Sequence, residues 1–233
     1  VLNVDDPRGR ELEEIAQERG QEVISIGRTE DCTLQLTSQR YHMTGQQIRF
    51  LYNGRPQTVQ LDLIGGFQAE NVLVAAGLAI ASGSDPDEVF ATFPALTTVR
   101  GRMQLAAKRD NGAAIFVDYA HTPDALATAL EALRPHVMGK LVVVFGAGGD
   151  RDTTKRKLMG KAAADYADVV IVTDNNPRTE APAAIRAMVL EGCPDANEYG
   201  DRAEAILRGV DMLDPGDALL IAGKGHETGQ IVG

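Results

Sequence analysis

The stretch Val169-Val170-Ile171-Val172 is a short apolar run, and the polar segment Asp174-Asn175-Asn176-Pro177-Arg178-Thr179-Glu180 follows it almost at once. An uninterrupted apolar run of this length is typical of a parallel strand that is buried on both faces. Ligands of open α/β sheets bind beyond the carboxyl ends of such strands. The stretch therefore predicts an α/β fold with a ligand site in the loop at 174–180.

Two other loops repeat this arrangement. Residues 146–152 are rich in glycine and charge and follow the apolar run at 141–145, and residues 223–227 follow the apolar run at 218–221. Because the carboxyl ends of parallel strands meet at one edge of a sheet, we expect the three loops to lie close together. Glycine beside charges of both signs suits a small anionic or zwitterionic ligand.

The pattern of strands and helices changes near residues 96–100. Beyond this point apolar runs alternate with helical patterns, which favours a doubly wound α/β domain. The first helix would be capped by Thr122, with Pro123 at its first position. We expect strands at about 102–107, 114–118, 140–145, 168–173 and 217–222, and helices at about 123–134, 153–166, 181–191 and 202–213.

The residues before this boundary carry a different pattern. Helical spacing predicts two helices, and Asp85-Pro86 marks the start of a third. Alternation between residues 32 and 63, together with the hairpin dipeptide Asn53-Gly54, predicts an antiparallel segment. The expected helices lie at 7–20 and 67–82, and the expected strands at about 23–26, 32–37, 45–52 and 57–63.

Composition narrows the class of protein. The 233 residues include 33 acidic and 23 basic side chains, and the formal net charge of −10 argues against a nucleic-acid partner. No apolar run reaches the ~20 residues of a membrane helix and no signal peptide is recognised, so we expect no membrane insertion.

Cys32 and Cys193 form no metal-like cluster, and we expect reduced thiols in the cytoplasm. Because the chain starts at Val1 rather than Met, we expect it to be part of a longer protein.

Two nucleotide-binding motifs are incomplete. The segment from Gly146 to Arg151 lacks the third glycine of a dinucleotide fingerprint. Gly223-Lys224-Gly225 lacks both the upstream glycine and the Ser or Thr of a phosphate loop. Arg151 is therefore interpreted as a cation for a ligand carboxylate or phosphate, and a surface pair with a neighbouring aspartate, Asp150 or Asp152, is the alternative.

Other charged residues also stand at strand ends. Asp118 could accept hydrogen bonds from ribose hydroxyls and His121 could stack on a base, or both could belong only to a capped turn. A guanidinium such as that of Arg178 suits bidentate capture of a carboxylate, and Glu227 could bind an ammonium, so that the two would fit an amino acid. Two solvated charges in a weak ion pair are the equal alternative.

Taken in order, the segments at 2–6, 65–71, 101–103, 118–123, 149–152, 176–178 and 223–227 resemble the Mur ligases over nearly the whole chain. The resemblance is strongest to the members that add meso-diaminopimelate during peptidoglycan synthesis. It implies that residues 1–98 form the C-terminal part of a P-loop-type central ATPase domain. Residues 99–233 would form most of the Rossmann-like C-terminal domain, which binds the acceptor amino acid.

The resemblance also implies an activity. An ADP-forming ligase of this family would join meso-diaminopimelate to UDP-N-acetylmuramoyl-L-alanyl-D-glutamate through an acyl phosphate, with ATP and Mg²⁺, as a cytoplasmic monomer. The family's phosphate loop and carbamylated lysine would lie upstream of Val1, so we assign no catalytic residue and no metal ligand to this chain. For the same reason we expect the chain by itself to ligate nothing.

The expected site residues follow from the resemblance, residue by residue. Asn71 would contact adenine, and Arg102 and Asp118 would contact the phosphate and ribose side of ATP, with His121 close by. Arg151 and Arg178 would hold the distal carboxylate of diaminopimelate, and Glu227 would hold its distal ammonium. The expected diaminopimelate-binding residues are Arg151, Asn175, Asn176, Pro177, Arg178, Gly223 and Glu227.

Three positions depart from the family pattern. Asn175 stands where the family has Asp, Gln68 where it often has Asn, and Gln104 where Glu is common. Arg178 is retained, and it favours diaminopimelate over lysine because a buried guanidinium would be left unpaired by lysine.

Other functions stay open at this point. A lysine-adding Mur ligase is opposed by Arg178, and a folylpolyglutamate synthetase is opposed by the diaminopimelate-like loops. A non-catalytic amino-acid-binding module is the alternative of another class. It is opposed by Asn71, Arg102 and Asp118, which would serve no purpose without ATP.

Overall fold

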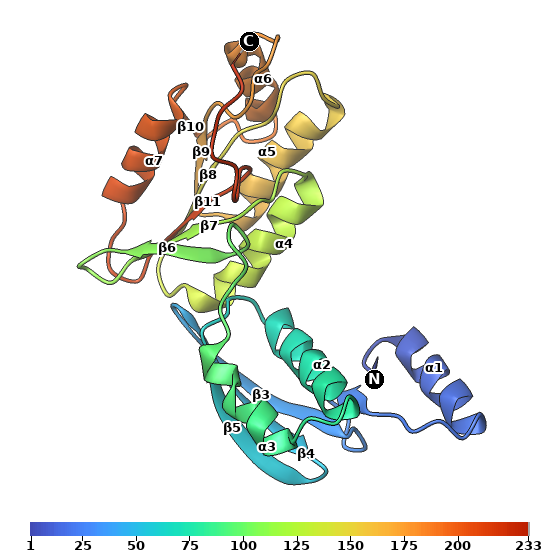
Figure 1. The fold of residues 1–233 in the computed structure, drawn as a ribbon. Coiled ribbons are helices and arrows are strands. Elements are labelled where there is room, and N and C mark those ends of the chain that lie inside the picture. Colours follow the sequence, from blue (N-terminus) through green and yellow to red (C-terminus); the bar gives the residue numbers. More distant parts are fainter. Residues whose placement is uncertain (233) are drawn as a thin grey trace. The chain divides into compact units, whose positions relative to one another are not determined.

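The computed structural model describes residues 1–232, and the chain divides into two compact units, Val1–Thr97 and Thr98–Gly233 (Figure 1). The first unit contains a sheet of five strands and the second a sheet of six. Each sheet is packed with its own cluster of buried hydrophobic side chains.

The sheet of the first unit has the order β1-β2-β3-β4-β5. β1, β2 and β3 run parallel, whereas β3, β4 and β5 pair antiparallel, as the alternating pattern predicts. β3 is longer than expected because its polar end, up to His42, pairs with the start of β4 at Gly45. The bounds of the five strands are Leu2–Asn3, Ser25–Gly27, Leu34–His42, Gly45–Tyr52 and Arg55–Leu61.

The turn between β4 and β5 confirms the hairpin predicted from Asn53-Gly54. Both residues have positive φ, 47° for Asn53 and 78° for Gly54. A two-residue turn of this type matches the right-handed twist of the flanking strands and strongly favours Asn followed by Gly.

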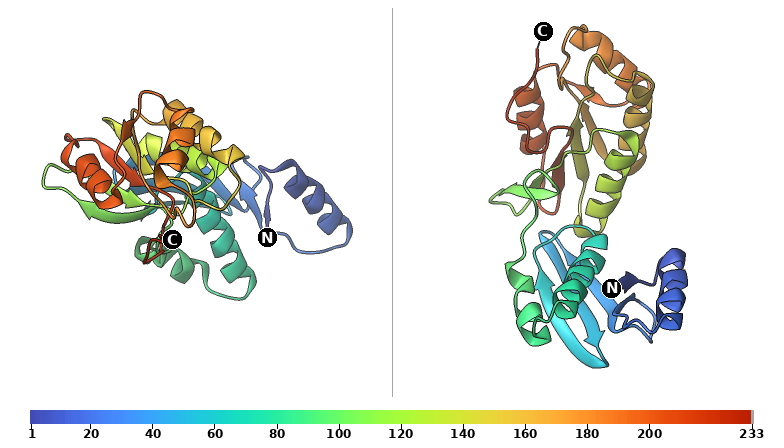
Figure 2. Two further views of the ribbon diagram at one scale, coloured as in Figure 1. Left: turned by 90° about the horizontal axis from the view of Figure 1, so that it is seen from above. Right: turned by 45° about the vertical axis from the view of Figure 1, so that its right-hand side comes forward.

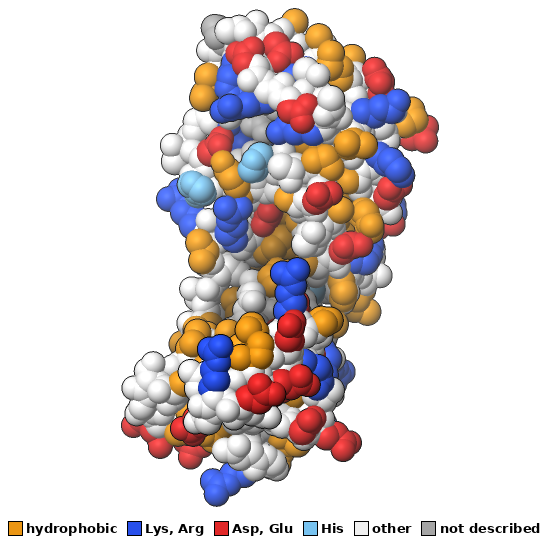
Figure 3. Space-filling model, turned by 90° about the vertical axis from the view of Figure 1, so that its right-hand side faces the viewer, with side chains coloured by type: hydrophobic (Ala, Val, Ile, Leu, Met, Phe, Trp, Pro, Cys, Tyr) orange, Lys and Arg blue, Asp and Glu red, His pale blue; other side chains and the backbone are white. Residues whose placement is uncertain are grey.

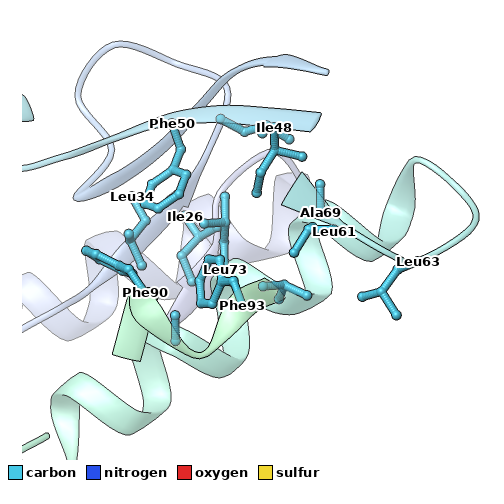
Figure 4. Close-up of a cluster of buried hydrophobic side chains, with 13 residues drawn as sticks. Ile26, Leu34, Ile48, Phe50, Leu61, Leu63, Ala69, Leu73, Phe90 and Phe93 are labelled. Atoms are coloured by element: carbon cyan, nitrogen blue, oxygen red, sulfur yellow. The ribbon is translucent and has the colours of Figure 1, made fainter. Parts of the chain in front are cut away.

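The helices of the first unit are α1 (Pro7–Glu18), α2 (Phe67–Ala81) and α3 (Pro86–Ala91), with a 3₁₀ turn at Phe93–Ala95. The carboxylate of Asp85 accepts hydrogen bonds from the first turn of α3, as expected of its cap. Phe50 of β4 lies 5.1 Å from the ring of Phe90 and 5.9 Å from that of Phe93, measured between centroids. Figure 4 shows these rings with Leu73 of α2 in the core of this unit.

The sheet of the second unit has the order β10-β9-β8-β11-β7-β6. All neighbouring strands are parallel except β6 and β7. The bounds are β6 Gln104–Lys108, β7 Ala114–Val117, β8 Leu141–Phe145, β9 Val169–Val172, β10 Asn197–Glu198 and β11 Ala218–Ile221. The parallel strands make this unit a doubly wound α/β domain, as predicted.

Two details differ from the sequence-based expectation. β6 starts at Gln104 rather than at residue 102, because Gly101 and Met103 have φ values of 72° and 45° and form a turn. β6 is also antiparallel to β7, since the connection at 109–113 is far too short for a parallel crossover. The short strand β10 was not expected, because two exposed polar residues carry no apolar signal.

Helices cover both faces of this sheet (Figures 1 and 2). α4, α5 and α6 lie along one face, and α7 packs on the other against β8, β9 and β11. Thr122 caps α4, and Pro123 occupies its first position, as predicted. The bounds are α4 Pro123–Leu133, α5 Thr154–Tyr166, α6 Pro182–Leu190 and α7 Arg202–Asp211, with a 3₁₀ turn at Arg134–His136.

The position of β11 brings the three expected ligand loops together. β11 lies between β7 and β8 and pairs in parallel with both. The carboxyl ends of β7, β8, β9 and β11 therefore face the same edge of the sheet. The loops at 118–122, 146–152, 174–180 and 223–227 all start from this edge.

The surface carries charges of both signs. On the face shown in Figure 3, acidic and basic side chains are interspersed with apolar ones over both units. Among residues 1–232, no helix combines the length and the apolar character needed to cross a bilayer.

The two cysteines are buried and unpaired, as expected of reduced thiols in a core. Cys193 is 2% exposed, and its thiol lies 3.5 Å from the carbonyl oxygen of Val189. Burial raises the pKa of the Cys193 thiol from an ordinary 9.0 to about 11. The folded protein therefore keeps this proton at a pH where the unfolded chain has lost it.

We expect the alkaline side of the stability curve to depend on Cys193. Stability from the neutral thiol is fully present below about pH 9 and is lost as pH rises towards 11, by roughly 2–3 kcal/mol. Denaturant unfolding at pH 8, 9, 10 and 10.5 should show the free energies of the original chain and of Cys193→Ala converging as pH rises. Parallel curves for the two proteins would contradict this expectation.

Candidate functional site

A cavity of about 310 Å³ opens at the carboxyl ends of β7, β8, β9 and β11. Each of the four loops that start there contributes to its wall. The lining residues are Tyr119, His121, Gly146, Gly148, Arg151, Lys155, Asn175, Asn176, Arg178, Gly223 and Glu227.

The structure brings most of the expected acceptor-site residues to this one cavity. Of that group only Pro177 is absent from the lining. His121, which was expected near ATP, lines the same cavity, whereas Arg102 and Asp118 lie outside it. Asn71 lies on α2 of the first unit, where its side chain is exposed.

Basic side chains outnumber acidic ones in the lining of this cavity. Arg151, Lys155 and Arg178 are basic, and Glu227 is the one acidic residue among the lining residues. Such a cavity suits a ligand with more negative than positive groups that still presents an ammonium to a carboxylate. A diamino acid with two carboxylates has this character.

Arg178 is held in an unusual backbone conformation. Its φ is 53°, in the left-handed region that side chains other than glycine rarely adopt. Its Nη1 donates a 2.6 Å hydrogen bond to the carbonyl oxygen of Gly149, and its backbone N–H donates to Ile231 at 3.3 Å. The guanidinium is thus directed across the cavity edge towards the neighbouring loop.

The loops after β8 and β9 are cross-linked at several points. The N–H of Gly149 donates to the carbonyl oxygen of Asn176 at 2.9 Å. The carboxylate of Asp150 accepts from the hydroxyl of Thr179 at 2.7 Å and from its N–H at 3.2 Å. Asp152 accepts from the N–H and the hydroxyl of Thr154 at the start of α5. Within residues 1–232, neither Asp150 nor Asp152 forms an ion pair with Arg151, so the surface pair considered as an alternative is not present.

Glu227 belongs to a hydrogen-bonded cluster with Asn176 and Lys224. Its Oε2 accepts from Asn176 Nδ2 and from Lys224 Nζ, both at 3.2 Å. Lys224 Nζ also donates to Asn176 Oδ1 at 2.8 Å. Burial opposes ionisation of Glu227, but these hydrogen bonds and the charge of Lys224 outweigh it and lower the pKa of the carboxyl. Glu227 is therefore an anion beside the cavity rather than the partner of Arg178.

Asn175 joins the ends of three strands. It is 6% exposed, and its Nδ2 lies 3.4 Å from the carbonyl oxygen of Gly146 and 3.1 Å from that of Gly223. An ionised carboxylate has no proton to donate to these carbonyls. The departure from the family's Asp thus gives this chain a link between the ends of β8, β9 and β11.

Asp118 holds two backbone groups of the protein. Its Oδ2 accepts from the N–H of Met103 at 2.8 Å, and its Oδ1 accepts from the N–H of Ala120 at 2.7 Å. The carboxylate thereby fastens the turn at 101–103 to the end of β7. Gln104 supports the same turn, since its Oε1 accepts from the N–H of Gly101 at 2.9 Å.

Tyr119 is the centre of a group of rings beside the cavity. The guanidinium of Arg102 lies 4.7 Å from its ring centroid, and the ring of His226 stacks on it at 5.4 Å. His121 meets it edge-on at 4.8 Å, with Nδ1 3.0 Å from the carbonyl oxygen of Tyr119. Since a carbonyl only accepts, Nδ1 carries the proton in this contact.

A second cavity of about 480 Å³ adjoins the first. Asn176, Arg178 and Glu227 line both cavities, and residues 228–231 extend the second one. The three shared residues therefore stand between two spaces, which gives room for an elongated ligand with a charged group at each end.

Several residues of the site were not expected from the sequence. Tyr119 and Lys155 line the cavity, and Lys155 Nζ donates to the carbonyl oxygen of His121 at 3.3 Å. Lys224 was noted only as half of an incomplete phosphate loop. Lys155 stands four residues before the buried Met159, so the two side chains lie on the same face of α5. This spacing is the signal that could have placed Lys155 on the face towards the sheet and its loops.

Comparison with known families identifies two matching regions. Residues 101–225 match the Mur ligase, glutamate ligase domain, and residues 1–79 match the Mur ligase middle domain. The first match alone covers more than half of the chain.

Similar proteins agree with these matches. The UDP-N-acetylmuramoyl-L-alanyl-D-glutamate--2,6-diaminopimelate ligases of Bradyrhizobium diazoefficiens and Zymomonas mobilis are 51% and 49% identical to this chain over its whole length. The chain spans 48% of each relative. A solved diaminopimelate ligase is 35% identical, with a TM-score of 0.79 over 98% of this chain and 48% of its own. Folylpolyglutamate synthase of Mycobacterium tuberculosis, solved with ADP, shares the fold at a TM-score of 0.65 and 23% identity, over 93% of this chain and 50% of its own.

Proposed function

Because this chain belongs to the Mur ligase family, we propose that it is the acceptor-binding half of a UDP-N-acetylmuramoyl-tripeptide synthetase. The whole enzyme would join meso-diaminopimelate to UDP-N-acetylmuramoyl-L-alanyl-D-glutamate, with release of ADP and phosphate. The proposal includes a cytoplasmic monomer, in keeping with two unpaired thiols. Residues 1–98 would belong to the central ATP-binding domain and residues 99–233 to the acceptor-binding domain.

The observation that carries the proposal is the composition of the 310 Å³ cavity. Arg151 and Arg178 offer guanidinium groups to a carboxylate, and Glu227 offers an oxygen to an ammonium. The distal end of diaminopimelate carries both groups, whereas the distal end of lysine carries only the ammonium. The excess of basic residues therefore supports diaminopimelate as the acceptor.

The residues of this chain would position the acceptor rather than activate it. ATP supplies the activated carboxylate of the other substrate, in the manner implied by the family. Arg178 and Glu227 would fix the distal end, so that the proximal amine reaches that carboxylate in one orientation. Lys155, at the edge nearest His121, would face the negative charge that develops during the attack.

The proposed nucleotide contacts are those expected from the sequence, Asn71, Arg102, Asp118 and His121. Arg102 and His121 present charged or polar groups around Tyr119, which fits a nucleotide contact, and Asn71 stays a proposed contact of adenine. Asp118 also holds the turn at 101–103, which would keep Arg102 in place. Among residues 1–232, no three His, Cys, Asp or Glu side chains gather to hold a metal ion, and we derive no step through Mg²⁺.

Calorimetric titration of the chain with meso-diaminopimelate and with L-lysine tests the proposal. We expect measurable binding of diaminopimelate and at least a tenfold weaker response to lysine, because lysine leaves the guanidinium groups without a carboxylate. Equal or tighter binding of lysine would contradict the choice of acceptor. Binding of neither amino acid would contradict the assignment of this cavity to the acceptor.

A further inference from the structure

A charged side chain with no exposed surface lies behind the cavity wall. Arg156 is the third residue of α5 and is 0% exposed, although it stands between Lys155 and Lys157 in the sequence. Its Nη1 and Nη2 donate to the two carboxylate oxygens of Glu180 at 2.8 and 2.7 Å. This is a bidentate ion pair, the geometry that gives a charge pair a fixed orientation.

Glu180 connects this arginine to the loop after β8. Its Oε1 also accepts a hydrogen bond from the N–H of Asp150 at 2.5 Å. Arg156 Nη2 donates in addition to the carbonyl oxygen of Gly148 at 3.2 Å. One ion pair thus fastens three segments to one another: the loop at 146–152, the loop at 174–180 and the start of α5.

Stability alone does not account for a pair in which Arg156 is fully buried and the side chain of Glu180 is 30% exposed. The Nε of Arg156 is buried and has no hydrogen-bond partner among the described residues, so the guanidinium is incompletely satisfied. Buried ion pairs often contribute no more to stability than apolar side chains of the same volume. The hydrogen bonds from Arg156 and from the N–H of Asp150 lower the pKa of Glu180, so the pair stays charged in mildly acidic solution.

The fastened points lie next to the two arginines of the cavity. Arg151 directly follows Asp150, and Arg178 stands two residues before Glu180. Arg178 itself bonds Gly149, one residue from Asp150. A change at the ion pair would therefore shift the two guanidinium groups relative to each other, and a carboxylate held by both would lose its fit.

From this geometry we infer that Arg156 and Glu180 are positioning residues, whose ion pair sets the spacing between Arg151 and Arg178 and so determines how tightly the acceptor's distal carboxylate is held. The inference rests on the proposed function for the identity of the acceptor. The effect of the ion pair on the spacing of the loops can be measured without a ligand.

Glu180→Gln and Arg156→Met test the inference by removing one charge each. Glu180→Gln preserves the shape of the side chain, and it keeps the test informative if Arg156→Met does not fold. For both variants we expect the Kd for meso-diaminopimelate to rise about tenfold or more, measured well below the melting temperature of each. We also expect the amide protons of Gly149 and Asp150 to exchange at least about tenfold faster, without ligand.

A matched control pair joins Lys157 of the same helix to Glu191 at the end of α6. Lys157 pairs with Glu191 at 3.7 Å, and their side chains are 64% and 60% exposed. Lys157→Met and Glu191→Gln make the same chemical changes at the surface and should leave Kd and exchange unchanged. Arg156→Lys keeps the charge but not the two-pronged geometry and should give an intermediate Kd.

The outcomes separate this inference from the proposed function. If Glu180→Gln lowers the melting temperature but keeps the original Kd and amide exchange, the pair has only a structural role and the inference is wrong. If the unmodified chain binds no diaminopimelate, the proposed function fails, and the exchange of Gly149 and Asp150 in the two variants still decides whether the pair fixes the loops.

Discussion

Replacing Arg178 with alanine is expected to raise the Kd of the chain for meso-diaminopimelate by about 100-fold. Removing one partner of a buried charge pair costs about 3–5 kcal/mol, and Arg178 is only half-buried, so we take the lower end. Alanine keeps the Cβ atom, so the strain of a φ of 53° is the same in both proteins. The rise in Kd therefore measures the contribution of the guanidinium group and not a change in backbone strain.

Calorimetry with Arg178→Ala, Arg178→Lys and a control measures this effect. Lysine at position 178 keeps the charge but cannot contact both a carboxylate and Gly149 in the same way, and an intermediate Kd is expected. Arg208→Ala is the control, since Arg208 is 59% exposed on α7, and its partners Glu204 and Tyr199 do not line the cavity. A Kd for Arg178→Ala within threefold of the original would show that this side chain does not hold the acceptor.

Replacing Gly149 with alanine is expected to destabilise the second unit by ~3 kcal/mol and to abolish binding of the acceptor. A Cβ atom at this position would lie 1.9 Å from the carbonyl oxygen of Pro177 and 2.7 Å from its carbonyl carbon. Both are backbone atoms of the neighbouring loop, so no side chain can turn aside. The two loops must separate, which breaks the hydrogen bond from Arg178 to Gly149.

Thermal unfolding and calorimetry of Gly149→Ala together test this expectation. For a unit of this size we expect the melting temperature to fall by about 10 °C. Gly229→Ala is the matched control, because nothing lies within 4 Å of an added Cβ there. A melting temperature for Gly149→Ala equal to that of the control would contradict the close approach of the loops.

Much of the fold followed from local patterns in the sequence. Apolar runs predicted β7, β8, β9 and β11 because runs this short, bounded by glycine and charged residues, favour a buried strand over a helix. The same runs located the loops after them, and most of the expected acceptor residues line one cavity. The strand order was not predictable in this way, since pairing partners far apart in the chain leave no local signal.

The unpredicted parts of the site depend on tertiary contacts. Arg156 stands in a run of three basic residues that suggests an exposed helix face, yet it lies on the same face as the buried Met159 and Ala163. Its partner Glu180 comes from another loop, so only the fold shows that the two meet. Asp118 has the position of a ligand contact, but the turn at 101–103 supplies a backbone N–H to it.

The place of β11 in the sheet has a consequence for how the protein is made. β11 leaves the ribosome after β6 to β10, yet it lies between β7 and β8. Until it is synthesised, those two strands of the nascent chain lack their shared neighbour and expose unpaired backbone edges. Long-range parallel pairing of this kind is slow. The second unit can therefore complete its sheet only after β11 has been synthesised, and the open edges of β7 and β8 are until then the places where aggregation would start.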